Sequence, residues 1–197
     1  MTASDGRQGQ GAGTPVPRSA SSVPAAGLPD YAELRCVSTF SFLVGASQPE
    51  ELVERAHKQG YRALALTDEC SVAGVVRAHV AGKKIGLKLL IGSQFSVAVP
   101  EPSGDDAPGP FSLGVLACNL NGYGNLCEFI TKLRRASEKG TYHLDLGDIA
   151  SDELADCVVV ASPVRGSTDA QLVGLARWLL THFTGRCSVF AQKATTM

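Results

Sequence analysis

The sequence lacks an excess of charge of either sign, and it lacks a long apolar run. Its 197 residues include 18 Lys and Arg and 19 Asp and Glu, so the formal net charge is -1. A strongly basic nucleic-acid module would need a clear cationic excess, so the composition argues against one, although a local patch is compatible with it. No segment is long and apolar enough for a membrane span. No apolar signal segment opens the chain, which predicts a cytoplasmic protein.

Closely spaced cysteine pairs are also lacking. The six cysteines are scattered, and no two are separated by only two residues. Most lie beside apolar residues, as Cys157 does before three valines, which is typical of small buried thiols. We therefore expect free thiols in a reducing compartment, in preference to a redox or metal role.

Large apolar residues are scarce in residues 1–29, which consist mainly of Gly, Ser, Ala, Pro and Gln. Such a segment buries too little surface to offset its ordering entropy, so we predict a disordered tail. From Tyr31 onward, strand and helix patterns alternate. Strands are expected at 32–37, 63–67, 89–91, 94–99, 113–117, 157–161 and 188–191, and helices at 47–59, 72–84, 124–139 and 169–182.

This alternation predicts an α/β fold with a largely parallel sheet covered by helices, either open or closed into a barrel. In both cases the chemistry belongs at the carboxyl ends of the strands. The polar residues expected there are Arg35, Asp68, Glu69 and Gln94.

Four segments in order resemble one known family. They are 34–47 (LRCVSTFSFLVGAS), 60–71 (GYRALALTDECS), 90–95 (LIGSQF) and 116–126 (LACNLNGYGNL). They resemble motifs of the polymerase and histidinol phosphatase (PHP) domain, which opens bacterial C-family DNA polymerases. The Thr-Asp-Glu ending at 67–69 is most similar to the error-prone branch of that family.

The resemblance implies a distorted (β/α)7 barrel over residues 30–191. Active members bind a cluster of metal ions at the carboxyl ends of the strands and hydrolyse phosphoesters. Residues 192–197 do not resemble the family, and the barrel is expected to be incomplete at its C-terminal end. We therefore expect a truncated product with an unpaired edge, exposed apolar surface and low solubility.

The family's metal ligands are not matched here. The positions that correspond to them carry, in chain order, Arg35, Val37, Val44, Glu69, Gln94 and Ser112. A guanidinium cannot bind a cation, a valine has no donor atom, and an amide is a poor substitute for a bridging carboxylate. We expect no cofactor, no metal site and no catalytic residue, and instead an ion pair of Arg35 with Asp68 or Glu69.

Other conspicuous residues have simpler explanations. Trp178 is expected to be a packing anchor, and the four histidines are expected to be solvated or packed. A basic group near the end of the helix at 124–139 is expected to be a solvated helix end, with contact to DNA phosphate as the alternative; it comprises Lys132, Arg134, Arg135 and Lys139.

The resemblance implies the N-terminal domain of an error-prone DNA polymerase that acts in DNA replication and damage-induced translesion synthesis. The chain alone is then a metal-free structural domain whose partners are the rest of the polymerase chain, DNA and other replication or translesion proteins, with no membrane. Two alternatives stay open: a metal-dependent phosphoesterase or 3'-5' exonuclease, and a free-standing interaction module.

Overall fold

The computed structural model describes residues 30–99 and 107–190. The tail predicted at 1–29 and the end segment at 192–197 lie outside the described residues. Within the described part, no helix is both long enough and apolar enough to cross a bilayer.

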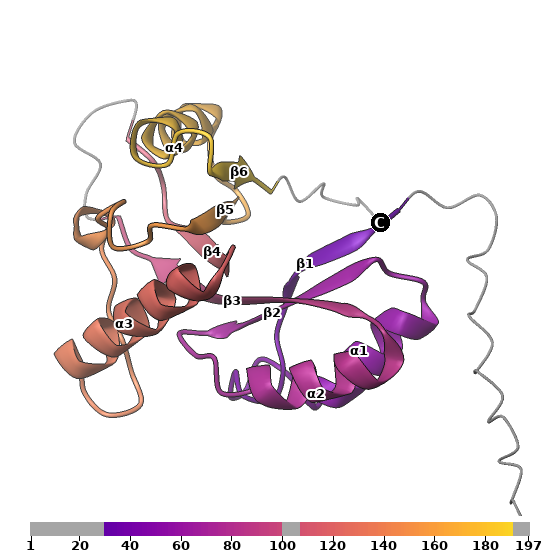
Figure 1. Cartoon of the computed structure of the whole chain (residues 1–197). Coiled ribbons are helices and arrows are strands. Elements are labelled where there is room, and N and C mark those ends of the chain that lie inside the picture. The colour runs from indigo at the N-terminus through magenta and orange to yellow at the C-terminus, as the bar shows by residue number, and fades with distance from the viewer. Residues whose placement is uncertain (1–29, 100–106, 191–197) are drawn as a thin grey trace, which may run out of the picture.

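Within residues 30–99 and 107–190, six strands form one mixed sheet in which sequence order and spatial order coincide (Figure 1). They are β1 (Ala32–Cys36), β2 (Ala63–Glu69), β3 (Lys88–Val97), β4 (Phe111–Ala117), β5 (Cys157–Pro163) and β6 (Cys187–Val189). The pairs β1–β2, β2–β3 and β5–β6 are parallel, whereas β4 runs antiparallel to both of its neighbours. A sheet of this order that curls on itself is an incomplete barrel, which confirms the predicted α/β fold class.

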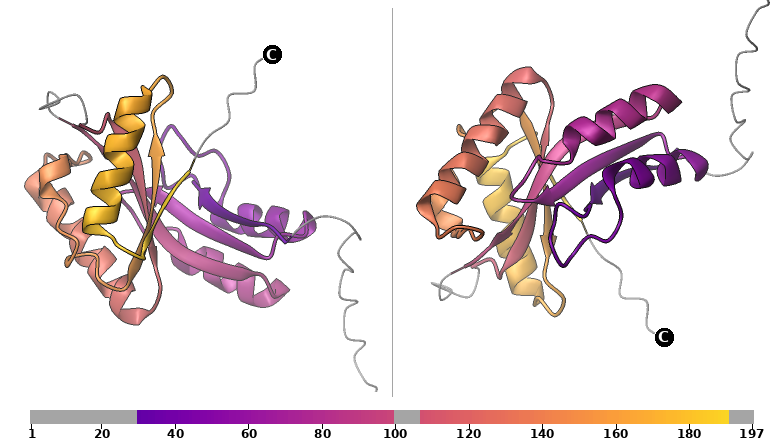
Figure 2. Two further views of the ribbon diagram at one scale, coloured as in Figure 1. Left: turned by 90° about the horizontal axis from the view of Figure 1, so that it is seen from above. Right: turned by 90° about the horizontal axis from the view of Figure 1, so that it is seen from below.

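In the part of the chain that the structure describes, four helices cover one face of the sheet, as Figure 2 shows. They are α1 (Pro49–Lys58), α2 (Val75–Ile85), α3 (Leu120–Ala136) and α4 (Asp169–His182), with a short 3-10 turn at Leu146–Asp148. Strand register puts Leu66, Ile91 and Phe95 on the covered face, because alternate residues of a strand point to opposite sides. The core therefore forms between the outer face of the curled sheet and the helices.

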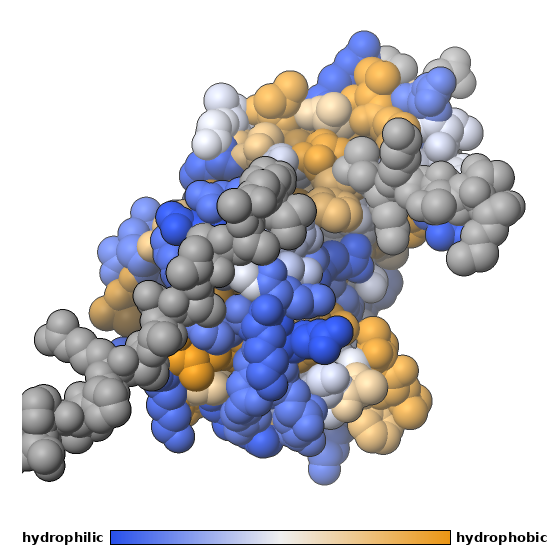
Figure 3. All heavy atoms as spheres, turned by 90° about the vertical axis from the view of Figure 1, so that its right-hand side faces the viewer, coloured by the Kyte–Doolittle hydropathy of each residue, from blue (hydrophilic) through white to orange (hydrophobic). Residues whose placement is uncertain are grey.

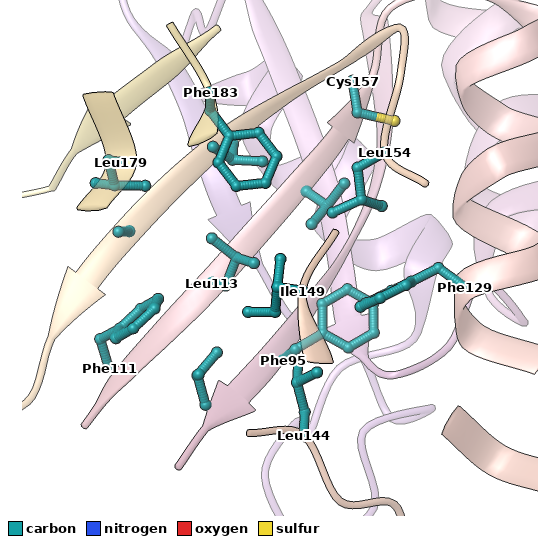
Figure 4. Close-up of a cluster of buried hydrophobic side chains, with 14 of the residues drawn as sticks. Phe95, Phe111, Leu113, Phe129, Leu144, Ile149, Leu154, Cys157, Leu179 and Phe183 are labelled. Carbon is teal, nitrogen blue, oxygen red and sulfur yellow. The ribbon is translucent and has the colours of Figure 1, made fainter. Parts of the chain in front are cut away.

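This core has two parts. Leu64 and Leu66 of β2 pack with α1 and α2, while the larger cluster lies under α3 and α4. At its centre, Phe95 and Phe129 meet edge to face with ring centroids 5.2 Å apart (Figure 4). Trp178 packs against the larger cluster, and its ring centroid lies 5.7 Å from that of Phe111. This confirms its expected role as a packing anchor.

No helix of the described residues covers the other face of the sheet. Part of this face borders a groove of about 960 Å³. The strand residues that line the groove include Leu34, Leu90, Leu116, Val158 and Val160. Strands β1 and β6 have no outer neighbour among the described residues. Figure 3 views the molecule from the right-hand side of Figure 1 and shows hydrophobic surface in the upper part, where α4 and β6 lie, and further hydrophobic patches in the lower part. The predicted exposed apolar surface is present; low solubility stays a prediction.

Several local expectations differ from the structure. The segments at 89–91 and 94–99 belong to one strand, β3, because Gly92 and Ser93 continue the pairing without a break. Helix α1 begins at Pro49 and not at residue 47, because Gln48 is its N-cap, with a backbone N–H that donates to Glu51. Helix α3 begins at Leu120, since Asn119 accepts a hydrogen bond from the N–H of Gly122.

The cysteines are all free thiols, as expected. Cys70 and Cys157 are buried, three others are half-buried, and Cys118 is exposed. Burial raises the pKa of Cys70 and of Cys157 to about 11. Both thiols are therefore protonated at neutral pH and are poor nucleophiles or metal ligands.

Candidate functional site: the polar cluster at the strand ends

Three of the four polar residues predicted at the strand ends come together, and the fourth, Asp68, binds a separate loop. Arg35 lies near the end of β1, Asp68 and Glu69 end β2, and Gln94 lies in β3. The parallel register pairs Glu69 with Gln94, so their side chains leave the same face of the sheet. This is the open face, at the edge where active barrel enzymes place their chemistry.

Gln94 links the cation to the carboxylate. The Nε–H of Arg35 donates to Oε1 of Gln94 over 2.9 Å, and Nε2 of Gln94 donates to Oε2 of Glu69 over 2.9 Å. Arg35 also donates to the hydroxyl of Ser112 over 3.3 Å. The predicted direct ion pair of Arg35 with Asp68 or Glu69 is therefore wrong, because a neutral amide that can both accept and donate lies between the two charges.

The second oxygen of Glu69 is occupied from the opposite side. Ser96 donates to it from its backbone N–H and its hydroxyl, over 3.2 and 3.1 Å, and the phenol of Tyr142 donates a short hydrogen bond to the same oxygen. Burial, together with this bond to a carboxylate, raises the pKa of Tyr142. The phenol is thus a permanent donor, and Glu69 has partners on both oxygens.

Tyr142 was not predicted as a site residue. It follows α3 in a segment without a regular pattern, and nothing in its surroundings along the chain indicates contact with β2 and β3. Only the tertiary fold brings it there.

Asp68 is held separately, in a buried loop network. Its side chain accepts hydrogen bonds from the backbone N–H and the hydroxyl of Ser38, over 2.7 and 2.8 Å, and from the hydroxyl of Ser41 over 2.7 Å. Asp68 is only 1% exposed. A buried carboxylate that accepts three hydrogen bonds acts here as the anchor of the loop after β1.

Arg134 ties this region to the end of α3. Its guanidinium donates to the backbone carbonyls of Glu69 and Cys70, over 3.2–3.3 Å, and to those of Gly140 and Thr141, both over 3.2 Å. It also lies 5.5 Å from the ring centroid of Tyr142. The expectation of a solvated helix end is wrong for Arg134, because the strand end supplies carbonyl acceptors within its reach.

Replacement of Arg134 by Met should therefore lower the free energy of unfolding by about 2 kcal/mol, because several carbonyls lose a charged donor. The matched control is Arg135→Met on the exposed side of the same helix, which should change it by less than about 0.5 kcal/mol. Urea unfolding followed by circular dichroism measures both. Equal values for the two variants would contradict the bridging role.

The other predicted positions contribute less. Val37 and Val44 both lie in the loop between β1 and α1. Val37 is half-buried, and Val44 is 67% exposed. Of the histidines, His143 pairs with Asp145 over 3.0 Å and the ring of His182 contacts the carbonyl of Trp178. In the described part of the chain, no three His, Cys, Asp or Glu side chains are placed to share a metal ion.

These residues do not fit the metal cluster that active PHP domains hold. Arg35 is a permanent cation at the centre of the site, and both Gln94 and Glu69 already have hydrogen-bonding partners. The remaining carboxylate, Asp68, is turned toward the serines of the loop. No catalytic step through a metal can be derived from this donor set.

Comparison with known proteins decides the family. The family model for the PHP domain matches residues 33–172. The chain belongs to the PHP domain family. The match includes the loop after β1, the strand-end cluster and all of α3, and it ends within α4, so the cluster described above lies inside the matched domain.

Curated relatives carry the same domain in much longer proteins. An error-prone DNA polymerase of Ralstonia nicotianae is 50% identical over an alignment of 173 residues that covers 83% of this chain and 15% of the relative. An error-prone DNA polymerase of Burkholderia mallei is 58% identical over an alignment of 159 residues that covers 74% of this chain and 15% of the relative. The chain thus spans about one seventh of the length of these polymerases.

A solved structure supports the fold. A Bifidobacterium adolescentis protein assigned as a metal-dependent phosphoesterase aligns with a TM-score of 0.53 at 17% identity, over 79% of this chain and 76% of that one. At this identity the likeness establishes the α/β architecture of the PHP domain and nothing about activity.

Proposed function

We propose that this chain is a metal-free, non-catalytic PHP domain of an error-prone DNA polymerase, in which it acts as a structural unit during translesion synthesis. The observation that carries the proposal is the Arg35–Gln94–Glu69 link, which occupies the place of the metal cluster with protein groups. The Gln94 amide joins the cationic guanidinium of Arg35 to the carboxylate of Glu69 without a metal ion.

The remainder of the polymerase chain and DNA are the proposed partners, with other replication or translesion proteins around them in the cytoplasm. Residues 30–191 are the proposed extent of the domain. The similarity to error-prone polymerases at 49–58% identity supports this assignment. The nucleotidyl transfer itself is proposed to reside in the part of those polymerases that this chain does not match.

Hydrolysis assays test the non-catalytic role. The purified chain, incubated with Mn²⁺ or Zn²⁺, should release no more product from 3′-labelled single-stranded DNA or from bis(p-nitrophenyl) phosphate than a protein-free control does. Metal-dependent hydrolysis that is lost in Glu69→Gln would overturn the proposal in favour of an active phosphoesterase.

A further inference from the structure

Three consecutive apolar side chains stand in solvent on the loop between β1 and α1. Phe42, Leu43 and Val44, which we call the 42–44 triplet, are 84%, 91% and 67% exposed. Residues 36–48 contain no charged side chain. Single exposed apolar residues are ordinary, but three in a row without a flanking charge form a surface suited to an apolar partner.

The loop that carries the triplet is tightly held. The hydroxyl of Ser41 donates a hydrogen bond to the buried carboxylate of Asp68. The carbonyl of Ser41 accepts hydrogen bonds from the N–H groups of both Val44 and Gly45. The N–H of Thr39 donates to the carbonyl of Ser47 and closes the base of the loop. The triplet is therefore presented in one conformation, which lowers the entropy lost when a partner binds.

The backbone at the tip is strained. Leu43 has a φ of 63°, in the left-handed region that a leucine adopts at a cost of about 1 kcal/mol. Gly45 passes so close to the loop base that an added Cβ would lie 1.9 Å from the carbonyl oxygen of Ser38. Glycine or asparagine would relieve the strain at position 43 in a loop that only had to turn. A leucine at this strained and exposed position is better explained by contact with a partner than by the turn itself.

We propose that the 42–44 triplet docks into an apolar recess on the rest of the error-prone polymerase chain, with Phe42 as the anchor. The inference rests on the proposed function, because the occupant is a part of the polymerase. The relatives are about seven times longer than the matched region, so most of their surface lies outside it. The absence of Lys and Arg from residues 36–48 makes DNA phosphate a poor occupant.

Photo-crosslinking in a full-length relative tests the docking. The error-prone DNA polymerase of Burkholderia pseudomallei, 58% identical over 159 residues, receives p-benzoylphenylalanine at the position aligned with Phe42. The position aligned with Lys83, an exposed charged residue of α2, is the control. After irradiation, mass spectrometry should find a crosslink from the position aligned with Phe42 to residues beyond the matched region. The position aligned with Lys83 should form no such crosslink.

Two results would overturn the docking. One is a crosslink only between two copies, accompanied by concentration-dependent association of the 197-residue chain that Phe42→Ser/Leu43→Ser abolishes. The other is no crosslink above the control. The hydrolysis assay of the purified chain reports separately on the proposed function: a missing crosslink without hydrolysis removes the docking alone, whereas metal-dependent hydrolysis that is lost in Glu69→Gln contradicts the non-catalytic domain.

Discussion

Replacement of Asp68 by Ala should lower the free energy of unfolding by about 3–4 kcal/mol, the largest loss expected from one substitution at the strand ends. The change removes the acceptor of three hydrogen bonds and leaves the N–H and hydroxyl of Ser38 and the hydroxyl of Ser41 without it. Each buried donor left without a partner costs about 1–3 kcal/mol. Urea unfolding followed by circular dichroism measures the effect.

The serines provide the matched controls for Asp68. Ser38→Ala and Ser41→Ala each remove one hydroxyl donor and leave the carboxylate with two of its three hydrogen bonds, so each should cost about 1 kcal/mol. A cost for Asp68→Ala no greater than that of either serine variant would show that the carboxylate does not anchor the loop.

Gly45→Ala should lower the free energy of unfolding by about 2–3 kcal/mol, because the new methyl group has no room. An ideal Cβ at Gly45 would lie 1.9 Å from the carbonyl oxygen of Ser38, which belongs to the backbone of the loop base and cannot rotate away. The loop must open to accept it, and the hydrogen bonds of Ser41 to Val44 and Gly45 are the first to be lost. Thermal and urea unfolding both report the change.

Gly124→Ala is the opposite case and serves as its control. Gly124 lies inside α3, and an added Cβ would meet nothing within 4 Å. Alanine favours the helix over glycine, so this variant should gain about 0.5–1 kcal/mol. Similar effects from the two substitutions would contradict the packing described around Gly45.

The sequence predicted the elements of the fold well where one face of each is buried. Helix α4 lies at the predicted 169–182, and β2 contains the predicted apolar run at 63–67, whose residues are all buried. The break between 89–91 and 94–99 was wrong because Gly92 and Ser93 look like a turn. Gly92 is in fact needed where an added Cβ would approach the carbonyl of Val115 within 2.5 Å.

The sequence predicted which residues lie at the strand ends, but it did not predict the hydrogen bonds that they form. Arg35, Asp68, Glu69 and Gln94 follow from the rule that parallel strands end at one edge. Their contacts depend on rotamers and on residues distant in sequence, such as Tyr142, which lies 73 residues after Glu69. Pairing by charge alone predicted an ion pair, and the structure has an amide between the two charges.

A metal titration tests the central proposal most directly. Isothermal titration calorimetry with Mn²⁺ and with Zn²⁺ compares the native chain with Arg35→His/Val37→His/Gln94→Glu, which places metal-binding side chains at three of the six positions that correspond to the family's ligands. We predict no saturable heat for the native chain and a binding isotherm for the triple variant. Saturable binding to the native chain that Glu69→Gln abolishes would contradict the metal-free domain proposed here.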